Sequence, residues 1–462
     1  MTIPRLGWPA ATAWRLVLSA GFLLMLAANL PGHMSYDSIV GLFEGRFHVR
    51  VTWAPAFYSW VLGVFDAVVP GTSLYVIASG LLLFASIASF ASLRGRVSWW
   101  AVALAAAAGL TPNFLIYQAI VWKDVFFANL GVAALVSLAH AARTWDRPWP
   151  RWGWLAATVL LLAAAALTRQ NGIIVAAVAA VAAGWIAAQG RWLRGLAWGA
   201  GGFAAVVVVV QVLGMYAVPT RVDNPAATDG MGRGLQILRN YDLVGAVALE
   251  PTLRLDALEG ANPTASALLR ADARNTYSAE RVDTLKAESG VAAALAGLPD
   301  QALTDAWVEL ITERPDVYLR QRLEVFRWVF LTPAVEKCLP VWIGIEGPAD
   351  RIAALGLPGG RDAADVQLYN YNTWFLGTPV VSHLAYAVIA LAVAGVLAVR
   401  RDRTDIAMLG LMVAALGFTA SFFFISLACD YRYLYFLDVA AVAGLIYLAV
   451  DPRLKLRPPP RG

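Results

Sequence analysis

The chain has 462 residues, of which 59% are hydrophobic and only 15% are charged, and its formal net charge is +5. A soluble protein of this length rarely combines so many apolar with so few charged side chains, so the composition excludes an ordinary soluble enzyme. Apolar runs of about 20 residues, the length that crosses a bilayer, recur along the chain. They are long Ala, Leu and Val blocks, not the weak alternation of a membrane β-barrel. The sequence therefore predicts an all-α integral membrane protein.

The apolar runs predict about ten transmembrane helices. The first run follows Arg5 and Arg15, ends at Leu30 and lacks a small-residue cleavage site, so we expect a span and not a cleaved signal peptide. The expected spans cover residues 12–31, 72–93, 98–116, 121–141, 152–168, 171–189, 194–217, 381–399, 405–427 and 432–450.

Lys and Arg residues in the short loops orient these spans. The terminal segments and the loops on their side hold 16 of them, against 5 in the short loops opposite. Positive loops stay in the cytosol, so we expect both termini there. High Ala, Trp and Arg usage indicates a bacterial inner membrane. Residues 53–69 could form a further span, but Arg94 and Arg96 would then lie outside. We prefer an interfacial helix within a first outer loop, 32–71.

The stretch 218–380 is polar, with 15 Lys and Arg and 21 Asp and Glu, and contains no continuous span. It predicts a mainly helical extracytoplasmic domain, inserted before the last three spans. The chain would then divide into a transmembrane module over 1–217, this domain, and a second transmembrane module over 381–462. Cys338 and Cys429 both fall on the predicted outer side. The sequence favours a disulfide between them and two unpaired thiols about equally.

Acidic residues fall at the outer ends of two spans. Asp37 follows the first span, and a carboxylate there can act as a general base or bind a divalent cation; the alternative is a helix N-cap. Lys123 and Asp124 begin the fourth span, where Asp124 needs a partner such as Lys123, an Arg or a metal ion. The alternative there is an interfacial ion pair, with Trp122 as a membrane-interface anchor.

Two basic turns lie at the same predicted surface. In the turn 167–172, Arg169 matches phosphate in fork geometry, and the following helix N-terminus adds partial positive charge. The alternative is that Arg169 extends to lipid phosphates. Arg432 lies between the last two spans and is a second candidate for binding phosphate. The alternative is that it only forms an internal ion pair with Asp430. Charges near hydrocarbon are costly and usually functional, so these groups indicate one active site. His33 and His48 of the first outer loop are further candidates for contact with an acceptor or metal.

At these residues the chain resembles the GT-C superfamily of membrane glycosyltransferases, which includes protein O-mannosyltransferases and lipid A aminoarabinose transferases. Asp37 matches the acidic residue that follows their first span, and Asp124 resembles the acidic residue at the head of a later span. The segment 53–60 resembles their aromatic, Pro-containing segment, although it has one Pro where the family often has two. The turn 167–172 resembles a Leu-Thr-Lys-Gly-like turn, and Arg432–Tyr433 an Arg-Tyr pair before a late span.

The resemblance implies an inverting glycosyltransferase that moves a sugar from a polyprenyl-phosphate donor to a lipid, glycan or protein acceptor outside the cytosol, facing the periplasm or exterior. Asp37 would be the general base, and Asp124 would hold a divalent metal ion, Mg or Mn, or position a basic residue. The donor phosphate would bind Arg169, Arg432 and Lys123. The implied substrate-binding residues are Trp53, Tyr58, Gln170, Asn171 and Tyr433.

Two other functions compete with this one. A polysaccharide polymerase or ligase also combines many spans with a large outer loop, but it would use a diphosphate lipid. A transporter or flippase for a lipid-linked sugar is less favoured, because transporters commonly place charges near the midplane in paired halves, whereas these charges gather at one surface. Under every reading the partners include membrane lipids, and no nucleic acid is expected.

Overall fold

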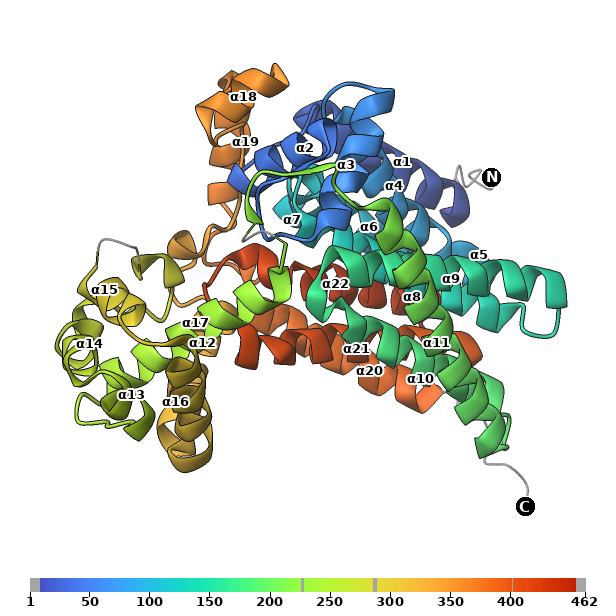
Figure 1. Ribbon diagram of the computed structural model, residues 1–462. Coiled ribbons are helices and arrows are strands. Elements are labelled where there is room, and N and C mark those ends of the chain that lie inside the picture. Colours follow the sequence, from blue (N-terminus) through green and yellow to red (C-terminus); the bar gives the residue numbers. More distant parts are fainter. Residues whose placement is uncertain (1–8, 226–227, 286–288, 401, 454–462) are drawn as a thin grey trace, which may run out of the picture. The chain divides into compact units, whose positions relative to one another are not determined.

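The computed structural model describes residues 9–225, 228–285, 289–400 and 402–453, which are mainly helical (Figure 1). The chain forms two compact units. Unit 1 comprises residues 1–225, 341–418 and 435–462, and unit 2 comprises 226–340 and 419–434.

Nine helices among the described residues are long and apolar enough to cross a bilayer, and a bent helix pair makes a tenth. This confirms the expected all-α integral membrane fold with about ten spans. The nine are α1 (Ala10–Asn29), α4 with α5 (Ser73–Ala88 and Phe90–Arg94), α8 (Lys123–Arg143), α9 (Pro148–Thr168), η2 with α10 (Gln170–Gly172 and Ile173–Ala188), α11 (Trp192–Tyr216), α20 (His383–Arg400), α21 (Arg403–Ile425), and η7 with α22 (Tyr431–Leu434 and Tyr435–Val450).

The third expected span, 98–116, is not one straight helix. It is divided into α6 (Trp99–Gly109), the single turn α7 (Pro112–Leu115) and η1 (Tyr117–Ala119), with a bend of 74°. Pro112 has no N–H to donate and disfavours helical geometry in the residue before it. Thr111 is accordingly extended, with φ −74° and ψ 150°. A hydropathy count cannot detect this break, because the residues around it remain apolar.

Helix α8 is the central helix of unit 1. Its apolar window is completely buried, and it packs against α4, α9, α10 and α22 (Figure 1). A helix that is apolar on every face is stable in such a position. Helix α11 is the opposite case, with only 6% of its window buried, as expected for a helix that faces lipid. Asp124, in the first turn of α8, therefore lies among protein side chains, whereas Lys123 is partly exposed and Arg143, at the other end, is exposed.

The first outer loop contains α2 (Tyr36–Phe47), β1 (Val49–Arg50) and α3 (Ala56–Val68). Strand β1 pairs in parallel with β2 (Arg221–Val222). Helices α2 and α3 cross where two glycines meet: a Cβ atom on Gly45 would lie 2.1 Å from the Ser59 carbonyl oxygen. The 13 residues of α3 extend about 20 Å at 1.5 Å per residue, which is too short for a bilayer core of about 30 Å.

Helices α1 and α4 show that this loop starts and ends at the same side. Near the start of α1, the Trp14 indole donates to the Ala88 carbonyl at the end of α4 (3.1 Å). At the other ends, the Thr72 hydroxyl donates to the Pro31 carbonyl (2.8 Å). The chain between α1 and α4 thus leaves and re-enters the helix bundle at the same end, as expected if α3 lies at the membrane interface and does not cross it. Arg94, which follows α4, is then at the same end of the bundle as the start of α1.

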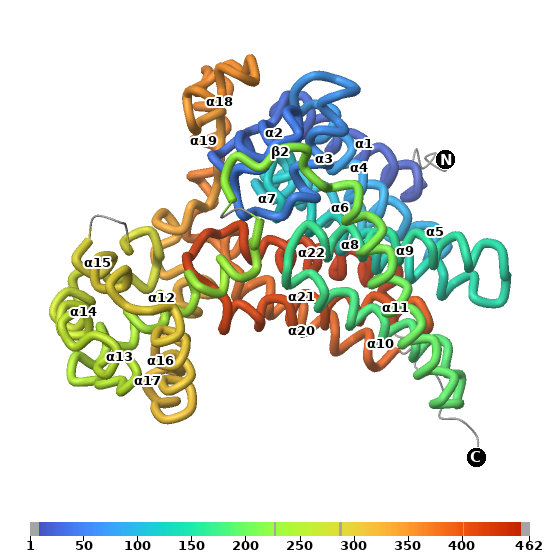
Figure 2. The backbone as a smooth tube through the Cα atoms, viewed as in Figure 1, coloured from blue at the N-terminus to red at the C-terminus, as the bar shows by residue number. Residues whose placement is uncertain are grey.

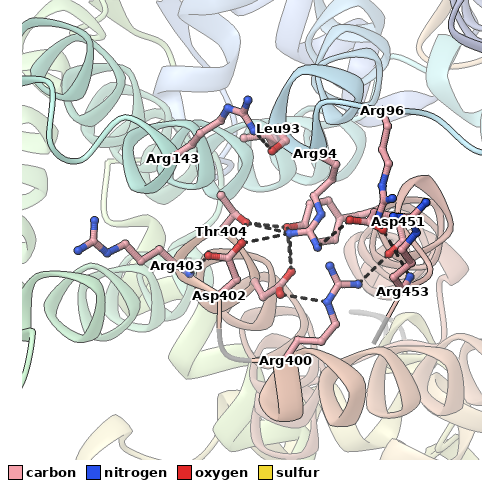
Figure 3. Close-up of polar contacts among 12 residues, drawn as sticks. Leu93, Arg94, Arg96, Arg143, Arg400, Asp402, Arg403, Thr404, Asp451 and Arg453 are labelled. Carbon is pink, nitrogen blue, oxygen red and sulfur yellow. Dashed lines mark hydrogen bonds and ion pairs between the residues drawn. The ribbon is translucent and has the colours of Figure 1, made fainter. Parts of the chain in front are cut away.

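The arginine-rich loops predicted to share one side are also in contact. Arg143 donates to the Leu93 carbonyl, and Arg94 pairs with Asp402 at 3.4 Å (Figure 3). Which side of the membrane faces the cytosol stays a prediction. Five residues that entered the charge count lie outside the described residues: Arg5, Arg401, Lys455, Arg457 and Arg461.

The structure divides the chain differently from the expected domain 218–380. Residues 341–380, with α18 (Ala349–Leu355), α19 (Ala363–Thr373) and η6 (Pro379–Val381), belong to unit 1. They are held on the first outer loop by backbone bonds, such as that from the Met34 N–H to the Gly344 carbonyl (2.9 Å), and by packing of α18 on α2. These pairings join residues about 300 positions apart, which composition alone does not reveal.

Unit 2 is a helical cluster around its own core (Figure 2). The Arg322 guanidinium, fully buried, pairs with Asp242 at 2.6 Å and donates to the Ser426 carbonyl at 2.6 Å. The disulfide Cys338–Cys429 makes a second link to residues 419–434, and resolves the open question about these cysteines. The helices are α12 (Gly230–Leu249), α13 (Asp256–Ala261), α14 (Pro263–Thr276), η4 (Val282–Thr284), α15 (Gly290–Ala296), α16 (Asp300–Glu313), α17 (Pro315–Leu331) and η5 (Val335–Cys338).

Candidate active site

The segment before α2 runs beside the segment before α8. The His33 N–H donates to the Ala119 carbonyl (3.0 Å), and the Val121 N–H donates back to the His33 carbonyl (2.9 Å). The Ser38 hydroxyl donates to the Val121 carbonyl (2.5 Å). These bonds place the first turn of α2, with Asp37, beside the first turn of α8, with Asp124.

Asp37 is the second residue of α2, and its side chain is exposed. The alternative that it caps this helix is wrong, because Ser35 is the N-cap residue. Asp37 therefore lies near the positive end of the helix dipole. Trp122 is not a membrane-interface anchor either: it is buried and donates to the Ser35 hydroxyl at 2.8 Å.

Asp124 and Arg169 form a buried ion pair. Their side chains are 1% and 11% exposed, and the guanidinium of Arg169 lies over the Phe418 ring, 5.5 Å from its centre. Arg169 therefore points into the protein, so the alternative in which it extends to lipid phosphates is wrong. A guanidinium has five N–H donors, and binding of the donor phosphate by Arg169 stays a prediction. Lys123, partly exposed, is the first residue of α8.

The turn that carries Arg169 is tight. Helix α9 ends at Thr168, Arg169 is extended with φ −139° and ψ 133°, and η2 leads directly into α10. Gly172 allows the return, because a Cβ atom there would lie 2.7 Å from the Ala165 carbonyl oxygen. Gln170 is exposed and Asn171 is partly exposed at the same turn. Their assignment to substrate binding stays a prediction.

The aromatic residues of the first outer loop have different environments. Trp53 is 43% exposed and is accessible to a ligand. Tyr58 is only 6% exposed, its hydroxyl donates to the Tyr75 hydroxyl at 3.3 Å, and its ring packs on Tyr75 and Phe126. The structure thus gives Tyr58 a packing role, and its predicted contact with substrate is untested.

Glu44 was missed by the sequence reasoning. It is 3% exposed, and its carboxylate accepts hydrogen bonds from the Val51 and Thr52 N–H groups at 2.8 and 2.7 Å and from the Ser59 hydroxyl at 2.8 Å. Arg50 pairs with it at 3.2 Å. Glu44 therefore fixes the connection between α2 and α3. The available signal was a carboxylate that directly follows the apolar run 39–43.

His33 is also structural in position. It is 3% exposed, its Nδ1 accepts the Gly344 N–H at 3.1 Å, and its Nε2 lies 2.9 Å from the Asn29 amide oxygen. These partners suit a neutral ring with its proton on Nε2. Burial lowers the pKa of His33 to about 4, although Asp365 and Asp362 act in the opposite direction. The ring joins the first outer loop to residues 341–365.

A second buried polar group lies among the spans. His383 and Asp438, both completely buried, approach to 2.9 Å, and the Asn113 amide lies 3.3 Å from the other oxygen of Asp438. Polar groups inside a membrane need such partners. The pair is not detectable from sequence, since it joins the start of α20 to α22 and to the single turn α7.

Two predicted residues, Arg432 and Tyr433, belong to unit 2. Arg432 pairs with Asp430 at 3.2 Å, so the internal pair considered as an alternative is present. The Tyr433 ring stacks on Phe422, with 5.7 Å between ring centres. Their roles toward a donor or acceptor stay predictions.

The described residues contain no group of three or more His, Cys, Asp and Glu side chains that could hold a metal ion. Asp124, the expected metal ligand, pairs with Arg169. Binding of Mg or Mn stays a prediction, and we derive no step through a metal ion.

Comparisons with known proteins give little further information. No protein-family description matches the chain, and no curated protein matches it. Similar solved structures include ArnT from Cupriavidus metallidurans in the apo state, with a TM-score of 0.37, and bound to undecaprenyl phosphate, with a TM-score of 0.35. Identity is 16% in both cases, over 95% and 94% of this chain and 78% and 77% of those chains. We draw no conclusion from TM-scores and identities this low.

Proposed function

We propose that this chain is a membrane glycosyltransferase that moves a sugar from a polyprenyl-phosphate donor to an acceptor on the side of the membrane opposite the arginine-rich loops. One observation supports it above all. An exposed carboxylate, Asp37, lies on a segment that is hydrogen-bonded beside the end of α8, where Asp124 pairs with Arg169. A base and an anion-binding group thus belong to the same outer end of the helix bundle.

In the proposed reaction, the acceptor oxygen or nitrogen attacks the anomeric carbon of the sugar. A bond forms from the acceptor to that carbon, and the bond from the carbon to the phosphate oxygen breaks. The acceptor proton passes to the Asp37 carboxylate, and the polyprenyl phosphate leaves. Attack opposite the leaving group inverts the anomeric centre. General bases in such positions contribute about 10²–10⁴-fold to the rate.

Arg169 stabilises the phosphate as negative charge develops on it, which is the role of fixed donors in a site with little water. Asp124 holds the guanidinium in place through the buried ion pair and is a positioning residue. Lys123, adjacent on α8, adds positive charge at the same rim. Residues 341–380, which are bonded to the first outer loop, cover the loop that carries the base.

The test uses the full-length protein in detergent with a radiolabelled polyprenyl-phosphate sugar. Asp37→Asn keeps the shape of the side chain and removes the base, so transfer should fall by about 10²–10⁴-fold with unchanged expression and unfolding temperature. Asp350→Asn is the matched control, because Asp350 is an exposed acid on α18 of the same unit; it should retain activity. Undiminished transfer by Asp37→Asn would remove Asp37 from the mechanism.

A second arm distinguishes the competing enzyme class. Wild-type protein is offered monophosphate and diphosphate lipid donors with the same sugar. Consumption of the monophosphate donor alone supports the proposal. Consumption of the diphosphate donor alone would instead indicate a polymerase or ligase, and sugar-lipid movement across vesicles without transfer would indicate a transporter.

A further inference from the structure

A polar pocket of about 690 Å³ opens at the end of α8 that is opposite the proposed active site. Asp124 and Arg143 are separated by 19 residues of this helix, or about 29 Å at 1.5 Å per residue, so the two sites are distinct. The volume lies within the range of about 300–1,000 Å³ that is usual for small-ligand sites. Its lining residues are Leu93, Ala142, Arg143, Trp185, Ile186, Ala188, Gln189, Gly190, Asp402, Arg403, Thr404 and Ile406.

The charges beside this pocket are mostly neutralised by one another (Figure 3). Arg94 lies 3.3 Å from Asp405 and 3.6 Å from Asp451. Arg400 pairs with the other oxygen of Asp405 at 3.1 Å. Ion pairs within such a network have no charge to spare for a ligand. They form a rigid base that joins the ends of α5, α20 and α21.

Arg143 is the exception. Its hydrogen-bond partner is neutral, the Leu93 carbonyl oxygen (Figure 3), and none of the described carboxylates lies within ion-pair distance of it. One bond to a carbonyl uses one of the five N–H groups of the guanidinium, and the exposed Arg143 side chain lines the pocket. Arg403 also lines the pocket. It pairs with Asp146 at 3.2 Å, and because that carboxylate is 83% exposed the pair is weak and can be exchanged for a phosphate. The one acid of the lining, Asp402, already accepts from Arg94 and the Arg403 N–H.

The wall formed by α10 faces lipid. Trp185 is 61% exposed and Val181, one turn earlier, is 67% exposed, so an apolar surface leads along α10 to the mouth of the pocket. Exposed Trp residues mark the level of lipid head groups. At the facing wall, the 23-residue helix α21 begins with Arg403 and Thr404, so its positive dipole end also points to this region. A lipid fits this arrangement, with its acyl chains on the apolar surface of α10 and its phosphate near the start of α21.

We propose that this pocket binds the phosphate of an anionic phospholipid head group, with Arg143 and Arg403 as the ligating residues and the acyl chains along α10. Basic pockets between transmembrane helices are the known physical setting for such head groups. A charge-assisted hydrogen bond from each guanidinium to phosphate gives the selectivity over zwitterionic lipids. The proposal is independent of the glycosyltransferase reaction, and a failure of either leaves the other standing.

The experiment measures binding of phosphatidylglycerol to the purified full-length protein by titration in mixed micelles, with phosphatidylcholine as the reference lipid. Arg143→Gln keeps a donor for the Leu93 carbonyl and removes the charge. We expect about tenfold or more weaker phosphatidylglycerol binding, the factor for one lost charge-assisted bond. Arg143→Lys should retain most of the affinity. Arg147→Gln is the matched control, since Arg147 is exposed and outside the lining.

Three results would overturn the proposal. Wild-type affinity in Arg143→Gln would show that the guanidinium takes no part. Equal losses in Arg143→Lys and Arg143→Gln would show that charge is not the determinant. Inorganic phosphate that competes fully with the lipid at millimolar concentration would identify the ligand as a free phosphate. A loss in Arg143→Gln, with retention in the lysine variant and in Arg147→Gln, supports it.

Discussion

The buried pair of Asp124 and Arg169 allows stability and activity to be separated. We consider three variants: Asp124→Asn, Arg169→Gln and the double variant. Arg169→Gln leaves a carboxylate that is 1% exposed without its opposite charge, and Asp124→Asn leaves a guanidinium that is 11% exposed. The more deeply buried charge is the more costly one to leave unpaired, so Arg169→Gln should be the more destabilising single change.

The expected size follows from the burial. At about 4 Å, two unit charges attract by about 4 kcal/mol with an effective dielectric constant of 20. Breaking a buried pair from one side typically costs about 3–5 kcal/mol, because the other charge remains buried. Removing both charges avoids that cost. The double variant should therefore be less destabilised than the sum of the singles, with a coupling of about 1–3 kcal/mol.

Activity should follow a different order. The double variant lacks the guanidinium that stabilises the leaving phosphate, and loss of one such donor reduces the rate by about 10²–10³-fold. Stability is followed by tryptophan fluorescence during chemical unfolding in micelles, and transfer by the radiolabelled-sugar assay. The exposed pair Arg221 and Asp223, 68% and 40% exposed, is the control and should give about 0–1 kcal/mol. Additive losses in the cycle, or wild-type transfer in the double variant, would refute the reasoning.

Three further predictions follow from other contacts. Burial lowers the pKa of His33 from 6.5 to about 4, so at pH values between these two the unfolded chain binds a proton and the folded chain does not. The free energy of unfolding should therefore fall by up to about 3 kcal/mol as the pH decreases from about 7 to 4. His33→Asn should weaken this pH dependence, measured as unfolding curves at several pH values. Cys338 and Cys429 should react with maleimide only after reduction, as intact mass will show, and Cys338→Ser should lower stability by about 2–4 kcal/mol. Gly45→Ala should push α2 away from α3 and lower the yield of folded protein, because the new Cβ atom would lie 2.1 Å from a backbone oxygen. Gly201→Ala is the control and should leave the yield unchanged, because a Cβ atom there has no neighbour within 4 Å.

Features that depend on neighbouring residues could be predicted from the sequence. The apolar runs give nine spans within a few residues of their observed bounds, because burial or lipid contact of a whole helix needs only a continuous apolar stretch. The short helix over 53–69 was distinguished from a span by the placement of Arg94 and Arg96. The bend before Pro112 was not predicted, although the proline itself was visible, since proline is tolerated in many membrane helices.

Features that depend on distant pairing could not be predicted. Asp124 was expected to need a partner, but several were open, and only the structure selects Arg169. The roles of Glu44 and His33 arise from backbone groups, at Val51 and Gly344, that have no sequence signature. The boundary of unit 2 near residue 340 is likewise set by contacts between residues that are distant in the sequence.

The central claim is that the Asp37 carboxylate takes the acceptor proton beside the anion-binding group Arg169. It is tested most directly by single-turnover sugar transfer in Asp37→Asn, with the affinity for polyprenyl phosphate measured on the same preparation. We predict an affinity close to that of wild type and a chemical step slower by about 10²–10⁴-fold. A chemical step of undiminished rate in this variant would contradict the claim.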